Sequence, residues 1–110
     1  MSVKLHSSLL GAGPPVILLH GLFGSGGNLG ALARTLSDRY QVHSVDLPNH
    51  GRSGWMERSD LAAMAGALGD WINHHELRTA TLVGHSLGGK VAMELALAPV
   101  SYTHLTLPTI

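Results

Sequence analysis

The sequence contains no cysteine, only five aromatic residues and no excess of either charge, with seven basic and seven acidic residues. Without cysteine there is no disulfide framework and no thiolate metal site. The balanced charge, with no run of one sign, argues against the basic surface of a nucleic-acid-binding protein or a polybasic membrane patch. No apolar run approaches the roughly 18–20 residues that span a bilayer. Because Lys4, Ser7 and Ser8 interrupt the N-terminal stretch, a signal peptide is not expected either. These absences favour a soluble, cytoplasmic protein.

What the chain does contain is an alternation of apolar strands and amphipathic helices. We expect a weak first strand around residues 3–5 and clear strands at 16–19, 41–46 and 79–83. Helices are expected from an N-cap at Asn28, over about 60–73, and from Leu87 to about Ala98. This order predicts an α/β fold with a mostly parallel sheet flanked by helices.

One stretch organises the rest: a short strand, a turn with Ser86 between Gly84 and Gly88, and a helix. The spacing G-x-S-x-G in this context is typical of a nucleophile elbow, in which a serine stands on strained backbone at a sharp strand-to-helix turn. The flanking residues must be small to avoid a clash, and the helix N-terminus faces any anion that forms beside the serine. The pattern therefore predicts Ser86 as a nucleophile.

A second glycine-rich loop follows the strand at 16–19, and it leaves two interpretations open. Gly24, Gly26 and Gly30 before a helix, with Asp46 after the next strand, suggest dinucleotide binding, but position 29 is leucine where the third glycine belongs. Alternatively, the loop at His20 and Gly21 supplies an oxyanion donor for acyl transfer.

Three segments, HGLFGSGGNLG, VDLPNHGRSG and LVGHSLGGKVAMELAL, occur in the order found in one family. They resemble the α/β-hydrolase superfamily, and most closely its small bacterial YbfF-type esterases, over residues 3–98. The resemblance implies hydrolysis of a small acyl ester or thioester without a metal or organic cofactor. It also implies that Ser86 is the nucleophile and that the backbone N–H groups of Leu22 and Leu87 form the oxyanion hole.

Other side chains near these motifs are candidates for the pocket or for its support. His20 is expected to brace the oxyanion loop, and His85 to play a structural or pocket role, since adjacent side chains on a tight turn diverge. Phe23 either lines an acyl pocket or packs in the core. The adjacent His74 and His75 point about 100° apart on a helix and make a poor metal pair, so no metal site is expected.

The catalytic acid and histidine of this fold follow the serine in the chain, and here only Glu94 and His104 do so. Glu94 is a helix-surface residue about 12 Å along the helix from Ser86. Residues 100–110, which include His104, resemble a translated sequencing adapter. We therefore expect residues 1–99 to be the N-terminal part of an esterase domain that stops before the acid and histidine, with an open edge on the strand at 79–83 and little turnover. A non-catalytic binding protein of the same fold is the alternative.

Overall fold

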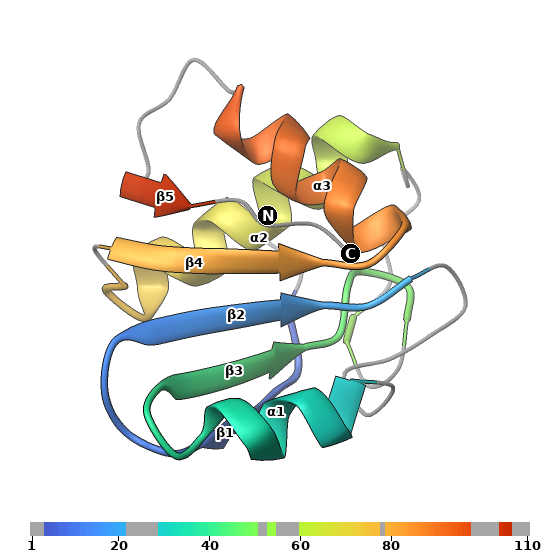
Figure 1. The fold of residues 1–110 in the computed structure, drawn as a ribbon. Helices are drawn as coiled ribbons and strands as arrows, with labels where there is room; N and C mark the ends of the chain where they lie inside the picture. Colours follow the sequence, from blue (N-terminus) through green and yellow to red (C-terminus); the bar gives the residue numbers. More distant parts are fainter. Residues whose placement is uncertain are drawn as a thin grey trace.

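The computed structural model describes residues 4–21, 29–50, 53–54, 60–77 and 79–97, together with the backbone of residues 104–106. Within these ranges the strands form one sheet in the order β1-β3-β2-β4-β5. Their bounds are Ser7–Leu10 (β1), Pro15–Leu19 (β2), Gln41–Val45 (β3), Thr79–Gly84 (β4) and His104–Thr106 (β5). Only β1 runs antiparallel to its neighbour, so β2, β3 and β4 all end at the same edge (Figure 1). The predicted mostly parallel α/β sheet is confirmed.

The central strand β2 lies between β3 and β4 and is covered on both faces. Ile17 and Leu19 pack into the larger core, whereas Val16 and Leu18 pack into the smaller one on the opposite face. All four side chains are buried. An unbroken apolar run is therefore the pattern that this position requires, because neither face of the strand meets water.

Three helices provide that cover: α1 (Gly30–Leu36), α2 (Leu61–His74) and α3 (Leu87–Ala96). α1 lies on the face of the smaller core, and α2 and α3 lie side by side on the other (Figure 1). The Asp60 carboxylate caps α2 by accepting the N–H of Ala63 at 2.8 Å. The buried face of α2 includes Met64, Ala65, Leu68, Trp71 and Ile72.

Two expectations at element boundaries are wrong. The first strand begins at Ser7, not around residues 3–5, and Leu5 instead enters the core ahead of it. β1 is placed by its hydrogen-bonded register with β3, not by burial, because Leu9 and Leu10 are both exposed. Helix α1 has Leu29 at its N-cap position with no side-chain hydrogen bond, and Asn28 lies outside the described residues.

The outer edge of β4 is only partly open. Residues 104–106, which the sequence assigned to a non-native tail, form β5 and pair with Thr79, Ala80 and Thr81. The expected open edge is thus covered along the first half of β4. Met93 on α3 and Leu97 directly after it are exposed at 48% and 83%, in keeping with the nearly all-round apolar sequence of this segment.

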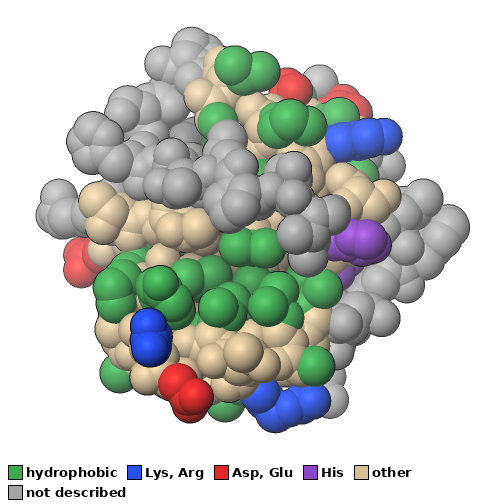
Figure 2. All heavy atoms as spheres, in the orientation of Figure 1, with side chains coloured by type: hydrophobic (Ala, Val, Ile, Leu, Met, Phe, Trp, Pro, Cys, Tyr) green, Lys and Arg blue, Asp and Glu red, His purple; other side chains and the backbone are tan. Residues whose placement is uncertain are grey.

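On the face shown in Figure 2, the described Lys, Arg, Asp and Glu side chains are scattered and form no patch of one sign, and hydrophobic side chains gather in a band across the middle of the view. In the part of the chain that the structure describes, no helix is long and apolar enough to cross a membrane.

Candidate active site

Ser86 stands at the turn between β4 and α3. Its backbone dihedrals are φ 54° and ψ −110°, in a region that residues with a Cβ seldom adopt. Ser86 is exposed, although Gly84 before it and Gly88 after it are buried. The strand, the turn and the helix therefore present the hydroxyl at the edge of the sheet on a strained backbone, as the sequence predicts for a nucleophile elbow.

Glycine is required at both flanking positions, because backbone atoms lie where a Cβ would be. A Cβ on Gly84 would lie 2.4 Å from the amide nitrogen of Gly89. A Cβ on Gly88 would lie 2.3 Å from the carbonyl oxygen of Leu19, at the end of β2. Real Cβ atoms do not approach backbone so closely, so the turn can fold over β2 only with glycine at these two positions.

The residues that follow β2 reach the elbow directly. The His85 N–H donates to the Leu19 carbonyl oxygen at 2.9 Å. A Cβ built on Gly21 would lie 3.6 Å from the Cβ of Ser86 and 3.2 Å from Cδ2 of the His85 ring. Thus the start of the predicted oxyanion loop lies against the serine, although Leu22 and Phe23 are outside the described residues.

The side chain of His20 links the loops after β2 and β3. Its ring is fully buried, Nδ1–H donates to the Gly21 carbonyl oxygen (2.7 Å), and Nε2 accepts the Leu47 N–H (2.9 Å). These two bonds fix the neutral tautomer with its proton on Nδ1. Burial lowers the pKa of His20 from its ordinary 6.5, and His50 lowers it further, while the bond to Gly21 and the charge of Asp46 partly oppose the shift. His20 therefore braces the loop, and its bonded nitrogens are not available to take the serine proton.

The loop after β3 is held by local bonds, of which those of Ser53 were not predicted from the sequence. The Ser53 hydroxyl donates to the Asp46 carbonyl oxygen and accepts the His6 N–H at 2.8 Å. His50 lies beside His20, with ring centroids 5.1 Å apart, and its Nδ1–H donates to the Pro48 carbonyl oxygen. The signal was present in the segment NHGRSG, whose short polar residues favour turns that bond back to the chain.

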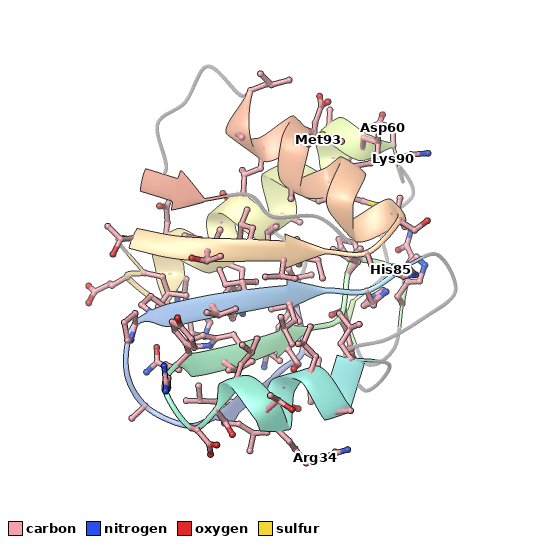
Figure 3. All side chains as sticks on the ribbon, viewed as in Figure 1. Arg34, Asp60, His85, Lys90 and Met93 are labelled. Carbon is pink, nitrogen blue, oxygen red and sulfur yellow. The ribbon has the colours of Figure 1, made fainter. Side chains whose placement is uncertain are left out.

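Two further candidates are described at the elbow. The His85 side chain is exposed where β2 and β4 end, next to the start of the loop after β2 (Figure 3). Leu87 is the first residue of α3, where backbone N–H groups lack intrahelical acceptors and point out of the helix end. The geometry thus brings together Ser86, His85, Leu87 and the start of the loop at Gly21.

The acid and histidine that follow Ser86 in the sequence lie away from it. Glu94 is exposed in the last part of α3, about 12 Å from Ser86 at 1.5 Å per residue. The backbone of His104 pairs with Thr79, at the start of β4, whereas Ser86 follows the end of that strand. In the described ranges, neither residue can complete a proton relay with Ser86. Those ranges also contain no group of three side chains able to hold a metal ion.

Comparison with known proteins gives consistent matches. The family described as an alpha/beta hydrolase fold matches residues 14–102. Esterase YbfF of Escherichia coli is 44% identical over 81 residues, which cover 74% of this chain and 32% of that protein. The pimeloyl-(acyl-carrier protein) methyl ester esterase of Chromobacterium violaceum is 40% identical over 94 residues, covering 86% of this chain and 35% of that protein.

A solved structure points the same way. A marine microorganism esterase superposes with a TM-score of 0.84 at 40% identity, covering 86% of this chain and 37% of its own. The chain therefore spans about a third of the length of these relatives. The matches favour the hydrolase interpretation of the two glycine-rich loops over the dinucleotide-binding one.

Proposed function

Because this chain belongs to the α/β-hydrolase family, we propose that it carries the nucleophile of a serine carboxylesterase acting on small acyl esters or thioesters. The observation that supports this most strongly is the backbone of Ser86, held at φ 54° by a turn that packs on β2 through Gly88. Strain of this kind persists only where the surrounding structure imposes it, and it is concentrated at functional sites.

In the proposed reaction, Ser86 Oγ attacks the ester carbonyl carbon while its proton passes to a histidine. The N–H groups of Leu22 and Leu87 stabilise the oxyanion, and the carbonyl re-forms as the alcohol or thiol leaves with that proton. Water then attacks the acyl–serine bond and releases the acid. No metal or organic cofactor takes part. Phe23 and His85 border the acyl group, and His20 holds the loop that carries Leu22.

The acid and the histidine of this site are supplied, in our proposal, by polypeptide other than residues 1–99. Residues 1–99 then form the N-terminal part of the hydrolase domain, and residues 100–110 are not needed for it. The 110-residue chain alone has little turnover, because an oxyanion hole without a base retains only a small part of the catalysis.

A chimera tests the proposal directly. Residues 1–97 are joined to the part of Escherichia coli YbfF that follows the corresponding helix, and p-nitrophenyl butyrate hydrolysis and fluorophosphonate labelling are measured. Ser86→Ala should lower turnover at least about 10³-fold and abolish labelling. Ser37→Ala is the matched control, since the Ser37 hydroxyl bonds to the Arg34 carbonyl oxygen at the end of α1.

Two results would contradict the proposal. Equal turnover of the Ser86→Ala and parent chimeras would remove Ser86 from the reaction. A chimera that is folded by circular dichroism, yet neither labels nor turns over, would favour the alternative of a non-catalytic binding protein.

A further inference from the structure

A second group of rings lies at the edge of the sheet opposite Ser86, where β3 begins and α2 ends (Figure 1). His43 of β3 meets Trp71 of α2 edge to face, with ring centroids 5.4 Å apart. Trp71 in turn overlaps His75, the residue that follows α2, at 4.4 Å and 31° between planes. These contacts join β3 to the C-terminal end of α2 through two titratable rings on either side of one indole.

His75 covers the outer side of the indole at the end of α2. Its side chain is exposed, and its Nδ1–H donates to the Trp71 carbonyl oxygen at 2.9 Å. This bond holds the His75 ring against the Trp71 ring.

His43, in contrast to His75, is buried. Its ring is 6% exposed, and Nε2–H donates to Oε1 of Gln41 at 2.9 Å. Leu9 and Ile17 occupy the register positions beside it on β1 and β2. Burial lowers the pKa of His43 from its ordinary 6.5, and the neighbouring His75 lowers it further. A proton on His43 would thus place a charge in apolar surroundings, close to His75.

The other described titratable side chains near this edge lie on its exposed surface. His74 meets the His75 ring edge to face at 5.2 Å. The remaining described ones come from α2, the turn after it and the loop before β3: Asp70, Glu76, Asp38, Arg39 and Tyr40. Among these groups, His75 is the one that lowers the pKa of His43.

The Trp71 indole contributes a third feature. Its Nε1–H is buried and has no hydrogen-bond partner among the described residues. A buried donor without an acceptor destabilises the closed arrangement, and it gains a bond to water when the contact opens. Ring packing therefore holds the junction closed, and the buried Trp71 Nε1–H without an acceptor favours its opening.

We propose that His43, Trp71 and His75 form an acid-responsive latch between β3 and α2. The latch is closed while His43 is neutral, and it opens when His43 is protonated. Opening frees the end of α2 and the residues that lead into β4, the strand whose other end carries Ser86.

The test uses the 110-residue chain with Trp55→Phe, so that Trp71 is the only tryptophan. Indole emission and far-ultraviolet circular dichroism are followed from pH 8 to pH 4.5. We expect a red shift of the indole emission at low pH, with the helical signal retained. His75→Gln moves this red shift to higher pH, because the repulsion on His43 is gone. His43→Gln removes the red shift.

His74→Gln is the matched control, since it changes the adjacent exposed histidine and should leave the red shift at the same pH. If His43→Gln does not fold at pH 7.5, the displacement of the red shift in His75→Gln decides alone. The proposal is overturned if the red shift of His75→Gln occurs at the same pH as that of the parent. A red shift that coincides with loss of the helical signal would also overturn it, since the change would then be global unfolding.

Discussion

Gly88 packs directly against the backbone of Leu19, so closely that a Cβ on Gly88 would lie 2.3 Å from the Leu19 carbonyl oxygen and 2.7 Å from that of His20. The first turn of α3 thus rests on the end of β2, and the loop that follows β2 is fixed relative to Ser86. The positive φ angles of the described glycines occur at Gly11 and Gly13. Gly88 is therefore required for the space it leaves, not for an unusual backbone conformation.

Gly88→Ala should accordingly lower the free energy of unfolding by about 3 kcal/mol or more, because the added methyl meets backbone atoms that cannot rotate away. Gly66→Ala is the matched comparison within α2, where an added Cβ meets nothing within 4 Å. That variant should gain about 0.5–1 kcal/mol from the better helix propensity of alanine. Urea unfolding followed by circular dichroism measures both. Similar effects of the two substitutions would show that the elbow does not pack as described.

The strain at Ser86 leads to a second prediction, which concerns stability and not catalysis. Ser86→Gly and Ser86→Ala both remove the hydroxyl, but only glycine adopts φ 54° and ψ −110° without strain. The glycine variant should therefore be more stable than the alanine variant by about 1 kcal/mol, after allowance for the greater freedom of glycine in the unfolded chain.

The same pair of substitutions at Ser37 provides the control for that comparison. Ser37 follows α1 with ordinary helical dihedrals of φ −66° and ψ −12°, so glycine should be the less stable of the two there. The midpoint of urea unfolding is the measurement. The same order of stability at both positions would contradict the presence of strain at Ser86.

The sequence predicted the features that repeat along the chain or require a rare residue. The unbroken run at Val16 to Leu19 indicated a strand covered on both faces, and the glycine spacing around Ser86 indicated the elbow, because few backbones tolerate other residues there. Helix α2 was predicted to within one residue from its apolar stripe, and the structure adds the Asp60 cap that fixes its start.

The features that could not be predicted from the sequence depend on contacts between residues that lie far apart in the chain. β1 carries no alternation that separates it from the neighbouring residues, and its position follows from pairing with β3, about 35 residues away. The latch residues His43 and Trp71 are likewise joined by the packing of α2 on the sheet. A lone histidine on a strand gives no sign of which aromatic ring will meet it.

The pH dependence of stability follows from His20, because only its neutral form accepts the Leu47 N–H. Its folded pKa is lowered from 6.5 by burial, so the unfolded chain binds a proton more readily. The free energy of unfolding is therefore highest above about pH 6.5, and it falls as the pH drops towards the folded pKa of His20. His43 acts in the same direction, because burial lowers its pKa too.

His20→Gln cannot titrate, so it should lose less stability than the parent between pH 7.5 and pH 5. The double variant with His43→Gln should lose less still. Urea unfolding at each pH gives these slopes; identical slopes for the parent and His20→Gln would mean that the buried imidazole does not control the acid sensitivity of the fold.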